Sequence, residues 1–417
     1  MRNKVYRLAA EFRSAAIWKY MYDSELFAVK LPDGSLGYCC VLGNLGKMLA
    51  LAVYPGDAGL ASYRKLGDTR EDTDLFRIKE RIMSQDCIMC AFDNKEEMEE
   101  RDLEDIRKSG VKCRAKQSYP LLRRYRPYCV PGFIDDQSDL EILGLALEAG
   151  LNIAAKIKAN TRNAQFAKMG LGFAEGIPFD RTIPLLEKRS DGDFSWSMVG
   201  LPAPSDKQSL TPVLANELQA QMYKKIRKSG AVECELFMCP KPVAHGVANK
   251  DGKVSEPEGM PFFPFMMLYV DHADGLVLHC VVTSEPGINA KTTSELTEGL
   301  LTCISQYKRP LKLFVRHQRV YALFSGIAEQ VGVKLEIKHN LPFVDEAAKD
   351  MYQTLEGDDD ESNPADEIAK LLNKLEATGG CDAVPNFMVD QLKNLADSEF
   401  ITAEDKERLL RLIGAKP

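Results

Sequence analysis

Apolar residues recur at two spacings along this chain, and each spacing predicts a different kind of element. Near the N-terminus Val5, Leu8 and Phe12 lie three or four positions apart, which predicts an amphipathic helix. Elsewhere, short apolar runs end at Pro, Gly, Asn or Asp, which is the pattern of strands joined by tight turns. The two patterns alternate along the sequence. They therefore predict a protein of the α/β (α+β) class.

Two segments of the chain share the order of their predicted elements. Glu-Leu-Phe opens a predicted strand at Glu25 and again at Glu235, and an apolar hairpin follows in both cases. After each hairpin the pattern predicts a helix, a buried strand, a second helix and a last strand. The last strands begin alike, as GVKCRAKQSYP at 110–120 and GVKLEIKHNLP at 332–342. We therefore predict two β-β-β-α-β-α-β repeats from one duplicated unit, compatible with a ribonuclease-H-like topology and with other mixed sheets.

The same patterns divide the chain into five segments. The sequence EGDDDESNPADE carries seven acids and no base, which is typical of a solvated linker, and apolar residues at helical spacing follow it. The predicted segments are a first α/β repeat at 1–134, a connecting helix and β-hairpin at 135–212, a second α/β repeat at 213–355, an acidic linker at 356–367 and a small helical bundle at 368–417.

Composition narrows the class of protein further. Of the 417 residues 45% are hydrophobic and 28% charged, as in soluble globular proteins, and the net charge of −7 weighs against a surface made for nucleic acid or anionic membranes. The N-terminus lacks an export signal, and no apolar run approaches the roughly 18 residues of a membrane span. Eleven dispersed cysteines fit a reducing compartment. We expect a cytoplasmic protein with no membrane partner and, because no cofactor motif occurs, no cofactor.

Carboxylates at predicted strand and helix ends suggest one kind of chemistry. Hydrolysis by two metal ions needs several clustered carboxylates. Asp93 ends the buried strand of the first repeat, and Asp135 and Asp139 lie at the start of a later helix. These three are the catalytic candidates for a metal-dependent hydrolase of nucleic acid or phosphoesters. The corresponding strand of the second repeat ends in Arg316-His317 with no acid, so we expect the set to be incomplete and the ancestry to be catalytically inactive.

Histidines and cysteines offer weaker candidates for a metal site. His272, His317 and His339 lie at predicted turns and strand ends of the second repeat and would hold a metal ion only if the sheet brought them together. Cys87 and Cys90 have the Cys-x-x-Cys spacing but lie in one predicted strand. Side chains alternate along a strand, so we expect the two sulfurs on opposite faces and no metal site there.

A basic stripe at 107–126 favours an alternative function. It contains eight basic residues and is interleaved with tyrosines, a composition typical of nucleic-acid binding. The preceding segment, 93–105, carries eight acids, which would neutralise the stripe if the two packed together. The candidate nucleic-acid-binding residues are Arg114, Arg123, Arg124, Arg126 and Tyr125.

Two stretches resemble a known family. The sequences from Glu25 to Leu66 and from Tyr125 to Ala149 are similar to an uncharacterised bacterial protein family built of domains of unknown function. The resemblance implies a bacterial, cytoplasmic protein and supplies no activity or site residues. Our leading interpretation is therefore a non-catalytic binding or adaptor protein that recruits another protein through its helical tail. The hydrolase and the nucleic-acid binder remain the alternatives.

Overall fold

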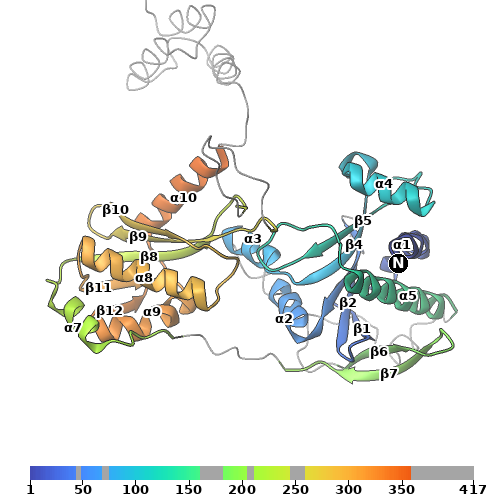
Figure 1. Ribbon diagram of the computed structural model, residues 1–417, viewed down its shortest axis with the longest axis horizontal. Helices are drawn as coiled ribbons and strands as arrows, with labels where there is room; N and C mark the ends of the chain where they lie inside the picture. The colour runs from blue at the N-terminus through green and yellow to red at the C-terminus, as the bar shows by residue number, and fades with distance from the viewer. Residues whose placement is uncertain (44–47, 68–74, 160–181, 204–210, 245–258, 358–417) are drawn as a thin grey trace, which may run out of the picture. The chain divides into compact units, whose positions relative to one another are not determined.

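The computed structural model describes residues 1–43, 48–67, 75–159, 182–203, 211–244 and 259–357 (Figure 1). These residues form two mixed β-sheets covered by helices, which confirms the predicted α/β class. The chain divides into two compact units, Met1–Lys349, which holds both sheets, and Asp350–Pro417. The predicted bundle at 368–417 and the predicted linker after Gly357 lie outside the described residues. None of the described helices has the length and apolar character that crossing a membrane requires.

The first sheet has the strand order β5-β4-β3-β2-β1-β6-β7, and within it only β1 and β6 pair in parallel. Its strands are β1 (Leu26–Lys30), β2 (Leu36–Leu42), β3 (Leu49–Pro55), β4 (Cys87–Asp93), β5 (Tyr119–Tyr125), β6 (Thr182–Lys188) and β7 (Phe194–Gly200). The helices in this part of the chain are α1 (Arg2–Ala15), α2 (Gly56–Gly67), α3 (Leu75–Met83), α4 (Glu100–Ser109) and α5 (Gln137–Ala159), with short 3-10 turns η1 (Ile17–Lys19) and η3 (Lys95–Glu97).

Both faces of the first sheet are covered. The predicted N-terminal helix is confirmed as α1, which packs with α5 on one face, while α2 packs on the other (Figure 1). Cys90 belongs to the apolar cluster under α1 and α5, and Cys87 belongs to the cluster under α2. The expectation that the two sulfurs lie on opposite faces is therefore confirmed. Burial raises the pKa of the Cys87 thiol to about 12, so it packs as a small apolar group.

The second sheet has the strand order β10-β9-β8-β11-β12. Both β8 and β12 are parallel to β11, and β9 is antiparallel to its two neighbours. This is the order 3-2-1-4-5 with the second strand reversed, an order compatible with the ribonuclease-H-like topology considered for the second repeat. The elements are α7 (Glu217–Lys225), β8 (Ala231–Met238), β9 (Phe265–Asp271), β10 (Val277–Val282), α8 (Ala290–Gln306), β11 (Lys312–Val315), α9 (Gln318–Val331), β12 (Lys334–Ile337) and α10 (Pro342–Gly357).

The two repeats share their element order but differ in how the strands pair. In the second sheet β11 lies beside β8 and parallel to it. In the first sheet the place beside β1 is taken by β6, from the connecting segment, while β4 and β5 extend the opposite edge. The strand equivalent to β11 is therefore β6. The predicted correspondence between Asp93, at the end of β4, and Arg316-His317, after β11, is wrong for this reason.

The predicted strand at 110–120 is also wrong. The strand begins at Tyr119 and continues to Tyr125, and residues 111–118 form a loop. Gly110 ends α4 and Gly332 ends α9, both in the left-handed conformation with φ of 76° and 70°. Glycine is favoured at such helix ends because it has no Cβ. The glycine shared by the two Gly-Val-Lys sequences thus marks the end of a helix in both places.

Helix α3 and the segment after β5 pack against the second sheet. The Lys79 ammonium on α3 donates to the carbonyl of Pro240, just after β8. The backbone N–H of Phe263 donates to the carbonyl of Tyr128 at 2.7 Å, and the Tyr128 ring meets Phe265 edge-on. These contacts place the side chains of α3 beside β8.

Candidate functional site

Two acidic side chains lie on one face of the central strand β8. Val232, Cys234 and Leu236 belong to the apolar cluster under α8 and α9. The residues between them, Glu233 and Glu235, face the opposite side, because side chains alternate along a strand. Glu233 is fully buried and Glu235 is 7% exposed. A buried carboxylate needs partners that compensate its charge and its lost hydration.

Glu235 is compensated mainly by arginines. The Arg77 Nη2 atom lies 3.4 Å from Glu235 Oε1, and the Arg316 Nε atom lies 3.6 Å from Oε2. The backbone N–H of Leu236 donates to Oε1 at 3.0 Å, and His317 Nε2 lies 3.9 Å from Oε2. Burial raises the pKa of Glu235, and Arg77 and Arg316 oppose that shift.

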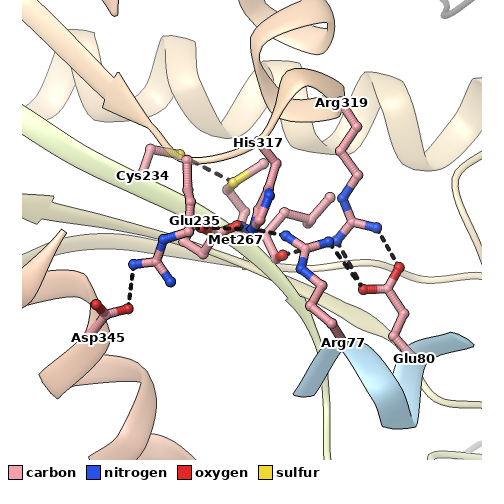
Figure 2. Close-up of polar contacts among 10 residues, drawn as sticks. Arg77, Glu80, Cys234, Glu235, Met267, His317, Arg319 and Asp345 are labelled. Atoms are coloured by element: carbon pink, nitrogen blue, oxygen red, sulfur yellow. Dashed lines mark hydrogen bonds and ion pairs between the residues drawn. The ribbon is translucent and has the colours of Figure 1, made fainter. Parts of the chain in front are cut away.

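The ion pairs continue on both sides of Glu235 (Figure 2). Glu80 on α3 accepts from both terminal nitrogens of Arg319 on α9, at 3.1 Å for Nη2 and Oε2. Arg316 pairs with Asp345 on α10. We call this set the Glu235 cluster: Arg77, Glu80, Glu235, Arg316, His317, Arg319 and Asp345. It sets three guanidinium groups against three carboxylates and joins α3, β8, α9 and α10.

Glu233 forms a separate pair two residues earlier on β8. Its Oε1 lies 2.6 Å from His272 Nδ1, and its Oε2 accepts from the backbone N–H of Val344 at 2.9 Å. Val344 lies in the first turn of α10, where backbone N–H groups lack partners within the helix and a negative charge is stabilising. Glu233 therefore fixes the start of α10 to the centre of the sheet.

The three candidate histidines are not brought together. His272 contacts Glu233, His317 contacts Glu235, and His339 is exposed after β12. Across the described ranges, no group of three or more His, Cys, Asp or Glu side chains is placed to hold a metal ion.

The candidate carboxylates of the first repeat have separate partners. Asp135 pairs with Arg101, and Asp139 lies 3.4 Å from Arg124. Burial raises the pKa of Asp139 although Arg124 opposes it. Asp93, at the end of β4, accepts from the backbone N–H of Asn94. These three residues belong to no metal-holding group among the described residues.

The basic stripe divides into two parts. In the first part, arginines on and after β5 are ion-paired. Arg123 forms a bidentate ion pair with Asp102 on α4, with both N···O distances 2.8 Å, and the residue is only 7% exposed. Arg124 pairs with Asp86 at 2.7 Å and Arg126 with Asp136 at 3.5 Å. Tyr125 packs against the apolar cluster under α2. The acidic segment 93–105 thus neutralises Arg123 through Asp102, which is what we expected if this segment packs against the basic stripe.

The second part of the stripe lines a cavity. Arg107, Lys112, Arg114 and Lys95, together with Cys113 and Tyr119, surround a hollow of about 570 Å³ between α4 and the loop at 111–118. We call it the basic hollow. Only Arg114 among the candidate nucleic-acid-binding residues belongs to it.

Sequence reasoning missed Glu235 as a site residue and Lys95 as part of the basic stripe. The available signal for Glu235 was the pair of acids at alternating positions in the otherwise apolar run AVECELFM. Lys95 lies outside the stripe in sequence, and only the fold brings it to Arg107 and Arg114.

Comparison with known proteins identifies two domains. Residues 3–170 match the model of a domain of unknown function, DUF7309, and residues 218–352 match that of a second domain of unknown function, DUF6930. No curated protein matches the chain. The first match contains α3 and the basic hollow, and the second contains β8 and the other elements of the Glu235 cluster. The predicted resemblance to domains of unknown function is therefore confirmed for these two parts of the chain.

Proposed function

We propose that this protein is a non-catalytic cytoplasmic binding protein, an adaptor that recruits a protein partner through the segment after Gly357. The observation that supports the proposal is the compensation of Glu235 by Arg77 and Arg316. A divalent metal ion would have to displace guanidinium groups that already pair with this carboxylate. Two-metal hydrolysis also needs several carboxylates around ions about 4 Å apart. The Glu235 cluster instead suits a structural role, in which opposite charges hold four elements in a fixed arrangement.

The adaptor role is tested by capture of partners from the native cytoplasm. We would compare the full chain with a chain ending at Gly357, a cut that leaves α10 complete. A matched full-length variant carries Leu409→Asp and Leu412→Asp, which place charges in a predicted apolar stripe of the tail. We expect both altered chains to lose the same specific partners. An identical partner list for all three chains would contradict the proposal.

The hydrolase alternative has its own test. We expect no hydrolysis of an activated phosphodiester or of single-stranded nucleic acid in the presence of Mg²⁺ or Mn²⁺. Metal-dependent hydrolysis that disappears in Glu235→Gln, while Glu346→Gln on the exposed side of α10 retains it, would overturn the non-catalytic assignment.

A further inference from the structure

The basic hollow is lined by cationic side chains that form no ion pair within the described part of the chain. Its cationic lining is formed by Lys95, Arg107, Lys112 and Arg114, and no carboxylate belongs to the lining. Among the described residues, the cationic nitrogen atoms of these four side chains lie more than 4.0 Å from any carboxylate oxygen. By contrast, Lys108 on the same helix pairs with Glu104 at 3.1 Å. Like charges gathered without counter-charges repel one another, so an anion that enters the hollow lowers their energy.

The hollow also has an apolar side. Ile106 is part of the apolar cluster under α1 and α5, and Val111, Cys113 and Tyr119 pack against that cluster from the loop and from β5. The same side chains line the hollow. A ligand that filled it would therefore contact cations on one side and aliphatic or aromatic surface on the other. Small-molecule sites commonly combine an apolar wall with a few polar groups in about 300–1,000 Å³, and the hollow of about 570 Å³ lies within this range.

Contacts on several sides fix the loop that forms the hollow. Gly110 turns the chain out of α4 in the left-handed conformation. The backbone N–H of Gln117 donates to Asn94 Oδ1 at 3.0 Å, and Arg13 on α1 donates to the Gln117 carbonyl at 2.7 Å. Lys112 and Arg114 are thus presented from a loop that these contacts hold in place, so binding has to order little additional backbone.

We propose that the basic hollow binds a small phosphorylated molecule with an apolar or aromatic body, of the nucleoside polyphosphate class. Four cations in one concave site match a ligand that carries several negative charges, and the apolar side matches its body. A nucleic-acid strand is disfavoured, because a strand needs a cationic track over several nucleotides. The continuation of the stripe along β5 is neutralised at Arg123 and Arg124. This inference is independent of the adaptor role.

The test measures binding of ATP, as the probe, to the full chain by calorimetry. Lys112→Ala combined with Arg114→Ala removes two exposed cations from the hollow. We expect at least a ~10-fold loss of affinity, because charge-assisted hydrogen bonds to phosphate are among the strong ones. The control is Lys108→Ala, whose ammonium pairs with Glu104 and lies outside the lining. We expect its affinity to stay within about 2-fold of the parent chain, since an exposed pair contributes little.

Cys113 provides a second readout, because its thiol lines the hollow. We expect ATP to slow the reaction of Cys113 with a maleimide, followed by peptide mass spectrometry, and to leave the rate at Cys280 on β10 unchanged. The proposal would be overturned if ATP did not bind, or if Lys108→Ala lost as much affinity for ATP as the double variant does. Inorganic triphosphate binding as tightly as ATP would overturn the apolar part of the assignment. A single-stranded oligonucleotide that binds more tightly than ATP and displaces it would show that the ligand is a polymer, which also overturns it.

Discussion

Glu148 on α5 illustrates how a single charged side chain is used in this protein. Lys4 on α1 lies 2.7 Å from its Oε1, and Lys188 on β6 pairs with its Oε2. Burial alone raises the pKa of Glu148, but the hydrogen bonds from Lys188 and Lys4 outweigh it, so the pKa lies below the ordinary value of 4.5. The carboxylate therefore ties the N-terminal helix and a strand to α5 only while it is ionised.

This arrangement predicts a pH dependence of stability. Because the folded-state pKa of Glu148 lies below the unfolded-state pKa, its contribution is present above about pH 4.5 and is lost as the pH falls through the lowered folded-state value. We expect Glu148→Gln to lower the free energy of unfolding by about 0.5–1 kcal/mol near neutral pH and by less near pH 3. Denaturant titrations at the two pH values measure this. The exposed Glu187→Gln serves as control, and an equal effect of Glu148→Gln at both pH values would contradict the prediction.

Residue types could be read from the sequence, but their partners could not. The sequence identified Arg123 as a basic candidate and the acids of 93–105 as its competitor, and the Arg123–Asp102 pair confirms that the two segments meet. The Arg77–Glu235 pair joins residues 158 positions apart, so no local pattern predicts it. Whether a charge is free or neutralised depends on tertiary packing. The sequence therefore could not separate the candidate Arg114, which lines the basic hollow, from the three candidate arginines that form ion pairs in the folded protein.

At the scale of elements, the two Gly-Val-Lys sequences show what a local pattern can predict. Both mark the end of a helix, because each glycine takes a left-handed conformation. After Gly332 the residues VKLEI alternate between apolar and polar and pair with β11. After Gly110 the residues VKCRAKQS lack apolar residues after Cys113 apart from one alanine, and they form the loop of the basic hollow. The helix end is thus encoded locally, whereas the strand depends on the residues that follow.

The left-handed conformation of the two glycines predicts how their replacement by alanine changes the free energy of unfolding. Gly110→Ala places a Cβ in open space, and Gly332→Ala meets no atom closer than 3.6 Å, so backbone strain alone opposes each change. We expect each to lower the free energy of unfolding by about 1 kcal/mol. Gly144→Ala in the interior of α5 is the matched control, since its nearest contact is also 3.6 Å and alanine favours a helix. We expect it to be neutral or stabilising in urea titrations. Equal losses at all three positions would contradict the strain argument.

At the scale of the whole molecule, element order was predictable and strand pairing was not. Both repeats run β-β-β-α-β-α-β, apart from the additional helix α3 in the first. The fourth strand inserts beside the first strand in the second sheet, but in the first sheet β6 holds that position and is parallel to β1. In the first sheet the hairpin of the connecting segment, β6 and β7, occupies this side of β1. Helix α3 packs against β8 of the second sheet, and the spacing of apolar residues along the sequence does not predict these contacts.

The contact of α3 with the second sheet makes a prediction for the molecule as a whole. Glu80, within the DUF7309 match, is 8% exposed and pairs with Arg319, within the DUF6930 match. We expect a double-mutant cycle of Glu80→Ala and Arg319→Ala to give a coupling free energy of about 1–2 kcal/mol, because the pair is partly buried and Arg319 donates two hydrogen bonds to Glu80. The unfolding free energies of the four proteins measure it in urea.

The matched comparison is the exposed pair of Glu104 and Lys108 on α4, for which we expect a coupling below about 0.5 kcal/mol. Its two residues belong to one helix, so their coupling does not depend on α3. A larger coupling for Glu80 and Arg319 would mean that α3 stays on β8 in solution and that Arg77, one turn earlier on α3, remains available to compensate Glu235. If the two couplings were equal, the docking of α3 would be too weak to neutralise Glu235, and the carboxylate would be open to other cations.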